Sequence, residues 1–339
     1  MPYTPIHPSV SSRINSEYAA YYEANLASQP EIYDLPLATV RSAGGILVPG
    51  GGPLLPVGKT EDLRVGPAND VPVRCFTPPG SPPDGGWPAM LYMHGGGWVL
   101  GNLDTENVIA THLCARAKCV IVAVDYRLAP ENPFPAAVED AWQAALWLAN
   151  TAPSLLPINP DRLCIGGCSA GGNLAAVICQ RAASIPPSSS PSSPAPSFRL
   201  QLLLAPVMDN TADTSNNPSW AENEHAPFLS AVKMLWFRNL YLPDEKDRSH
   251  PEASPLLWTG DWAALPPAVV VLAGLDPLRH EGERFASRLR DASVDVRLKV
   301  FEGQPHPFGA MDGVLEDGRR ALTWICESVR DVMYASSSQ

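Results

Sequence analysis

Residues 162–178 read RLCIGGCSAGGNLAAVI and combine three local patterns in one short stretch. The apolar Leu163–Ile165 predicts a buried strand, and residues 173–178 are compatible with a helix. Between them, Gly167–Gly171 fits the pattern Gly-x-Ser-x-Gly. A strand, a sharp turn and a helix in this order place Ser169 at the tip of a strained turn, where small neighbours let the backbone fold tightly. The alternative is a plain glycine-rich turn in which Ser169 only caps the helix.

Short apolar runs lie on both sides of this stretch and alternate with segments of helical period. The apolar runs cover residues 89–93, 119–126, 162–167, 200–207, 268–274 and 296–301. Segments 136–150 and 282–292 carry apolar residues at helical spacing. A hairpin is expected earlier, from residues 63–65 and 71–78 around the turn-like GPAND. The sequence therefore predicts an α/β fold with about eight strands in a mostly parallel sheet covered by helices on both faces.

A second glycine-rich motif, HGGGW at His94–Trp98, directly follows a predicted strand. Three glycines leave their amides unshielded, so the backbone can approach a substrate closely. Amides aimed at a carbonyl oxygen would stabilise the oxyanion that forms during acyl transfer. We expect Gly96 and Gly97, together with Ala170 after the serine, to supply these amides, while His94 holds the loop. A flexible turn or a phosphate-binding loop is the alternative, although no Lys-Ser or Lys-Thr pair follows.

A serine hydroxyl becomes a good nucleophile only when a base takes its proton, and the base needs a carboxylate to fix its tautomer. In a fold of this type the chain order is serine, acid, histidine. The histidines that follow the serine are His225, His250, His280 and His306. Only His306 lies in a loop after the last predicted strand. The first two fall in an inserted region and the third in the first turn of a helix, so His306 is the predicted base.

The acid is expected at the end of the strand that precedes the histidine loop, and Asp276 occupies that position. An Asp followed by Pro277 is also a helix N-cap with proline at the first helical position. The two roles are compatible. Glu302, just before the histidine loop, is the alternative acid.

The bulk composition excludes several classes of function. The net charge of −11 argues against binding to a nucleic-acid backbone. No apolar stretch reaches the length of a membrane span, and the N-terminus lacks a secretory pattern. Seven cysteines, an odd number set mostly in apolar runs, predict buried free thiols in a reducing compartment and hence a cytoplasmic protein. No His or Cys pairs occur at ligand spacing, so no metal site is expected.

Five motifs occur in order along residues 62–330 and together resemble the hormone-sensitive-lipase-like esterases of the α/β-hydrolase superfamily. They are HGGGW (94–98), DYRLAPENPFPAAVED (125–140), GCSAGGN (167–173), GLDPLRHEGE (274–283) and the histidine loop GQPHPF (303–308). The resemblance implies the α/β-hydrolase fold and agrees with a triad of Ser169, Asp276 and His306. It also implies that the protein needs no cofactor.

The sequence departs from this family at two places near the predicted site. Cys168 stands where the family usually has Asp or Thr, and the middle positions of such a turn normally point into the fold, so we expect Cys168 to pack. Pro305 and Pro307 bracket His306. A following proline pushes the histidine backbone toward an extended conformation.

Two segments are expected to lie outside the sheet and its helices. Residues 208–250 fall between two predicted strands and are too aromatic for a simple crossover, which predicts an inserted helical cap. The resemblance implies that residues 1–45 join this cap over the acyl pocket. The core then comprises residues 46–207 and 251–335. A low-complexity run at 185–197, rich in Ser and Pro, is expected to form an exposed loop.

These observations predict a serine hydrolase that cleaves carboxylic esters of small or medium, apolar substrates through an acyl-enzyme. Aromatic residues in the cap segments suggest an apolar substrate, and Trp98, Phe228 and Trp236 are expected to contact it. An amidase or formamidase, or a thioesterase, would use the same triad. A non-catalytic small-molecule receptor is the alternative from another class, although such a receptor usually lacks a triad residue. A monomer and a homodimer are both compatible with the fold.

Overall fold

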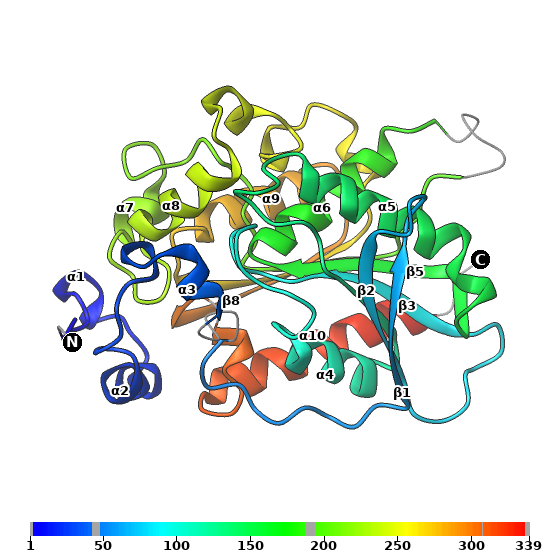
Figure 1. Ribbon diagram of the computed structural model, residues 1–339, viewed down its shortest axis with the longest axis horizontal. Helices are drawn as coiled ribbons and strands as arrows, with labels where there is room; N and C mark the ends of the chain where they lie inside the picture. The colour runs from blue at the N-terminus through cyan, green and yellow to red at the C-terminus, as the bar shows by residue number, and fades with distance from the viewer. Residues whose placement is uncertain (1–2, 43–47, 187–193, 307, 336–339) are drawn as a thin grey trace.

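The computed structural model describes residues 3–42, 48–186, 194–306 and 308–335. Its centre is an eight-stranded sheet with the strand order β1-β2-β4-β3-β5-β6-β7-β8. Figure 1 shows this sheet between layers of helices. The strands are β1 Lys59–Val65, β2 Val71–Thr77, β3 Trp87–Met93, β4 Val120–Val124, β5 Ile158–Cys168, β6 Gln201–Leu204, β7 Ala268–Leu275 and β8 Val296–Pro305. β2 pairs antiparallel with β1 and with β4, and the remaining neighbours are parallel. The predicted strand number and the lead-in hairpin are confirmed.

Helices cover both faces of the sheet, as predicted. The α-helices are α1 Pro8–Ser11, α2 Ser16–Asn25, α3 Leu37–Ser42, α4 Asn107–Ala117, α5 Ala136–Asn150, α6 Ala170–Ala183, α7 Pro218–Glu222, α8 Ala231–Tyr241, α9 Arg279–Asp291 and α10 Glu316–Tyr334. Short 3-10 helices are η1 Ile32–Asp34, η2 Ala152–Ser154, η3 Glu245–Ser249, η4 Pro255–Leu257, η5 Trp262–Ala264 and η6 Phe308–Ala310. In Figure 1, α5, α6 and α9 lie on one face, and α4 and α10 lie on the other.

Strand β3 shows why the apolar runs do not alternate with polar residues. All seven of its side chains are buried. Leu91 and Met93 belong to the core under α5, α6 and α9, while Met90 and Tyr92 belong to the core over α4 and α10. Successive side chains of a strand point to opposite faces, so a strand covered on both faces must be apolar throughout.

The N-terminal segment lies beside the insertion between β6 and β7, although the two are far apart in sequence. Figure 1 shows α1, α2, α7 and α8 at the same end of the molecule. The ammonium of Lys233 in α8 lies 2.9 Å from the carboxylate of Glu31. Arg13 donates to the side-chain oxygen of Asn223, just after α7, at 3.1 Å. These contacts join the two segments into one layer beside the sheet.

Several predicted elements coincide with the structure, and a few fall outside its described part. Helix α2 begins after Asn15, whose side chain caps it by accepting from the amides of Glu17 and Tyr18. The predicted loop at 185–197 lies partly outside the described residues, because 187–193 are not among them. Pro307, the second proline of the bracket, is likewise outside the described residues. Among the helices that are described, none combines the length and apolarity needed to cross a membrane.

All seven cysteines are unpaired and buried, as their apolar surroundings predict. Burial raises the pKa of the Cys114 and Cys326 thiols to about 12, which keeps them protonated at neutral pH. We therefore expect the native protein to react with less than about one equivalent of a thiol reagent such as dithionitrobenzoate, because the thiolate is the reactive form. After unfolding in urea, all seven thiols should react. Rapid reaction of several thiols in the native state would contradict this packing.

Candidate active site

Ser169 lies in the sharp turn between β5 and α6 that its sequence predicts. Its backbone has φ 55° and ψ −117°, a conformation that side-chain-bearing residues rarely adopt. A Cβ on Gly167 would lie 2.4 Å from the backbone of Gly171, and a Cβ on Gly171 would lie 2.0 Å from the carbonyl oxygen of Met93. Only glycine fits at these two positions. The Ser169 hydroxyl does not cap α6, so the plain-turn alternative is wrong.

Asp276 and His306 form a buried pair at the ends of neighbouring strands. Asp276 follows β7, His306 follows β8, and Asp276 Oδ2 lies 2.7 Å from His306 Nδ1. The other carboxylate oxygen accepts the amide of Leu278 at 2.9 Å. Helix α9 begins at Arg279 with Leu278 as its N-cap, so the predicted N-cap role of Asp276, with Pro277 at the first helical position, is wrong. Glu302, the alternative acid, is exposed. A carboxylate on Nδ1 fixes the proton there and leaves Nε2 free to act as a base.

Three hydrogen bonds from the N-terminal segment and the insertion hold this pair in place. The Asn223 side-chain amide donates to the carbonyl of Asp276 at 3.1 Å and to that of Gly274 at 3.3 Å. The backbone amide of Asn15 donates to the carbonyl of Gly303, in the strand that leads to His306, at 2.8 Å. The geometry of the pair therefore depends on segments outside the sheet.

The loop after β3 is held through its carbonyl groups. The Gly95 carbonyl accepts from the His94 ring nitrogen Nδ1 at 2.7 Å. The Gly96 carbonyl accepts from the amides of residues 99 and 100 at 3.1 and 2.9 Å. The N–H and C=O of a trans peptide point in opposite directions. The amides of Gly96 and Gly97 are therefore directed away from these contacts, and both glycines line the same cavity as Ser169.

His94 has the structural surroundings expected of a residue that holds the loop. Its ring stacks on that of Tyr126 with 4.3 Å between the ring centroids. Burial lowers the pKa of its imidazole to about 4, so the ring is neutral at neutral pH. A neutral ring with its proton on Nδ1 donates to the Gly95 carbonyl.

Ala170, the third predicted amide donor, is the first residue of α6. The first amides of a helix have no partner inside the helix. The N-terminus of a helix also carries a partial positive charge that favours an anion. The structure thus places the amide of Ala170 immediately after Ser169, at the end of a helix suited to stabilise negative charge.

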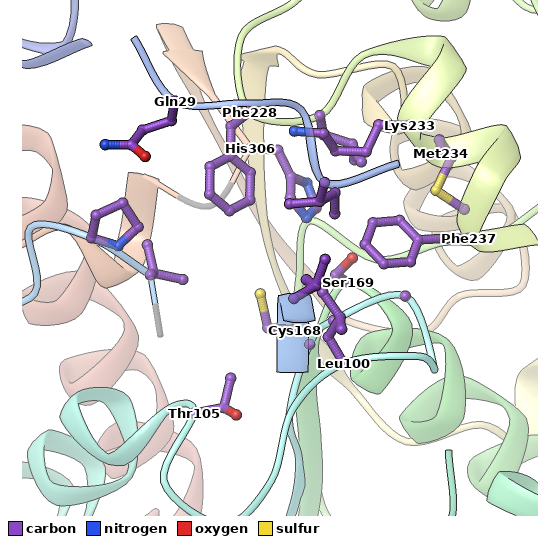
Figure 2. A pocket seen from close by; sticks show the side chains of 18 of the residues that line it. Gln29, Leu100, Thr105, Cys168, Ser169, Phe228, Lys233, Met234, Phe237 and His306 are labelled. Carbon is purple, nitrogen blue, oxygen red and sulfur yellow. The ribbon is translucent and has the colours of Figure 1, made fainter. Parts of the chain in front are cut away.

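Ser169 and His306 face one cavity of about 340 Å³ (Figure 2). Three parts of the chain form its wall. The N-terminal segment contributes apolar residues that include Leu26, Ile32, Leu35 and Val40. The insertion contributes Phe228, Leu229, Lys233, Met234 and Phe237, and the loop after β3 contributes residues 95–97 and Leu100. The cavity wall is therefore predominantly apolar, with Lys233 as a cation at its edge.

Two of the three aromatic residues expected to contact a substrate do not belong to the cavity wall formed by the described residues. Trp98 has a φ of 60° and is fully buried, with its ring stacked on Tyr241 at 4.2 Å between centroids. Trp236 packs edge-on against Phe237 at 5.0 Å. The structure contradicts the predictions for Trp98 and Trp236, because Trp98 is buried in the core and Trp236 lies outside the cavity-facing side of α8. Phe228 does line the cavity.

Phe237 lines the cavity, and the sequence interpretation missed it. The cavity-facing residues of α8 are Lys233, Met234 and Phe237. Their spacing of three and four places them on one helix face. Trp236 lies one position out of phase with that face. The helical phase of residues 231–241 was the signal that could have found Phe237.

Cys168 and Glu106 form a polar part of the wall next to Ser169. Cys168 is buried, as expected of a packing residue, but it also lines the cavity. Burial raises the pKa of its thiol well above the usual range, so it is protonated. Glu106 lines the cavity as well and was not found from the sequence. The prediction that Cys168 only packs is therefore incomplete.

Comparison with known proteins agrees with the observed architecture. Residues 90–310 match the model of a family described as having the alpha/beta hydrolase fold. The chain is 44% identical to the AB hydrolase superfamily protein C1039.03 of Schizosaccharomyces pombe, over 93% of each chain. It is 39% identical to the carboxylic ester hydrolase LipN of Mycobacterium tuberculosis, over 76% of this chain and 66% of LipN.

A solved structure shows the same similarity. The thermophilic and thermostable carboxylesterase EstE1, cloned from a metagenomic library, superposes with a TM-score of 0.78 at 33% identity. The match covers 90% of this chain and all of EstE1. The chain therefore belongs to the α/β-hydrolase family, in the group of hormone-sensitive-lipase-like esterases that its motifs predict.

Proposed function

We propose that the protein hydrolyses carboxylic esters of small or medium, apolar substrates, with Ser169 as nucleophile, His306 as base and Asp276 as the acid that orients it. The observation that carries this proposal is the meeting of a strained serine turn and a buried Asp–His pair at one apolar cavity. The names of the relatives, which are ester hydrolases and carboxylesterases, support ester cleavage over amide or thioester cleavage.

In this mechanism His306 Nε2 takes the proton of the Ser169 hydroxyl while the serine oxygen attacks the ester carbonyl carbon. Asp276 stabilises the imidazolium that forms. The carbonyl oxygen becomes an oxyanion, which the amides of Gly96, Gly97 and Ala170 stabilise. The C–O bond to the alcohol then breaks, and His306 returns the proton to the leaving oxygen. Water repeats the sequence on the acyl-enzyme and releases the carboxylic acid.

We assign residues 1–45 and 208–250 to a cap, and residues 46–207 and 251–335 to the core. Support comes from the cavity wall, to which both cap segments contribute apolar side chains. The ion pair between Glu31 and Lys233 joins the two segments at the cavity. A cytoplasmic location is supported by the seven unpaired cysteines, since reducing compartments keep thiols free.

Replacing Ser169 by Ala should abolish turnover of a p-nitrophenyl ester series from acetate to longer acyl chains. Alanine keeps the turn and removes only the nucleophilic oxygen. The unsubstituted enzyme should act best on short or medium chains, because the cavity holds about 340 Å³. An unchanged far-ultraviolet circular dichroism spectrum is the control for folding. Turnover by Ser169→Ala near that of the unsubstituted enzyme would remove Ser169 from the mechanism.

Replacing Asp276 by Asn should lower kcat by about 10³ to 10⁴, because an amide at this position favours the wrong imidazole tautomer. Glu302→Gln is the matched control, since it makes the same chemical change at the exposed alternative acid. Its kcat should equal that of the unsubstituted enzyme. The assignment fails if Glu302→Gln shows the large loss and Asp276→Asn does not.

A further inference from the structure

Glu106 is a buried carboxylate at the cavity wall to which the proposed mechanism gives no role. It is 7% exposed and lines the cavity together with Cys168 and Ser169. Burying a carboxylate is costly unless hydrogen bonds compensate for the lost water. The partners of Glu106 therefore indicate what its position provides.

Two hydrogen bonds connect Glu106 to separate parts of the site. Its Oε1 accepts the backbone amide of Gly95 at 2.9 Å. Its Oε2 accepts the hydroxyl of Tyr92, in β3, at 2.5 Å. Cys168 lines the same cavity as Glu106. One side chain thus joins the end of β3 to the glycine loop.

The peptide between His94 and Gly95 is held from both sides. The Tyr126 hydroxyl donates to the His94 carbonyl at 2.8 Å, and Glu106 accepts the Gly95 amide. Because the two groups of one trans peptide point in opposite directions, these contacts fix the plane of the peptide. A Cβ on Gly95 would lie 3.0 Å from Glu106 Oε1, so a side chain at this position would require the Glu106 carboxylate to shift. Residues 96–97, whose amides are expected to bind the oxyanion, come next in the chain after this fixed peptide.

We propose that Glu106 is a positioning residue that accepts the Gly95 amide and thereby sets the direction of the Gly96 and Gly97 amides. The inference rests on the proposed function, because it matters only if these amides bind the oxyanion. This role requires residue 106 to supply a hydrogen-bond acceptor for the Gly95 amide, and it does not require a negative charge. Glutamine keeps such an atom, whereas leucine of similar size does not.

The experiment compares Glu106→Leu with Glu106→Gln. The readouts are kcat and KM on a p-nitrophenyl ester, and the inhibition constant of an alkyl trifluoromethyl ketone, which forms a tetrahedral adduct with the serine. Glu106→Leu should lower kcat about 100-fold, as loss of an oxyanion donor does. KM should stay within about threefold, because the interaction acts in the transition state. The inhibition constant should rise by a factor similar to the loss in kcat, while Glu106→Gln should resemble the unsubstituted enzyme.

Two further variants separate positioning from stability. Leu322→Ala opens a buried site in α10 and should lower Tm without changing kcat, which shows that lost stability alone does not reproduce the effect. Tyr126→Phe removes the hydroxyl on the other side of the His94–Gly95 peptide and should lower kcat without raising KM. This variant tests the same arrangement if Glu106→Leu does not fold.

Several results would overturn the proposal. One is an unchanged kcat in folded Glu106→Leu or Tyr126→Phe. Another is a loss in Glu106→Gln as large as that in Glu106→Leu, since it would assign the effect to charge. Turnover that depends on Ser169 but not on Glu106 removes only the role of Glu106, whereas turnover that survives Ser169→Ala overturns the proposed function itself.

Discussion

The contact between the serine turn and the end of β3 is the constraint on which the rest of the site depends. Gly171 meets the carbonyl oxygens of Met93 and His94 so closely that no side chain fits between the two backbones. This contact places the start of α6 against the start of the glycine loop. The nucleophile and the amides of residues 96–97 therefore share one location because of backbone packing. A methyl group at Gly171 would push them apart.

Sheet topology brings together the other two residues of the site, Asp276 and His306. β3, β5, β7 and β8 are parallel, so their carboxyl ends lie along one edge of the sheet. In open α/β sheets this edge is where ligands bind. Asp276 and His306 extend from two adjacent strands there, which brings their side chains within hydrogen-bond distance without a special loop. Rigid strands thus position groups that are far apart in sequence.

Sequence alone could predict the parts of this structure that local patterns determine. Eight strands, the lead-in hairpin and the helices expected at 136–150, 173–178 and 282–292 follow from apolar runs and their spacing. The position of Asp276 at a strand end was enough to favour it over Glu302, and the structure places it on His306. That inference depended on residue type and on position after a strand. In a parallel sheet the carboxyl ends of the strands lie along one edge, so an acid and a histidine that follow neighbouring strands come close together.

The cavity wall could not be predicted in the same way, because it depends on how the segments pack against each other. Trp98 has a left-handed backbone that directs its ring into the core, which its aromatic character does not indicate. Glu106 reaches Gly95 only after the chain from β3 to α4 has turned back on itself. Its role depends on that three-dimensional path and not on a sequence motif.

The contact between the N-terminal segment and the insertion has a consequence for how the protein is made. Residues 13 and 223 are 210 positions apart, yet they are bonded in the finished molecule. During synthesis the N-terminal segment leaves the ribosome first. It cannot make its contacts with the insertion until the chain has been synthesised beyond residue 223. Contacts of such long separation form late in folding. A nascent chain therefore lacks a complete cavity until β8 and His306 have been made.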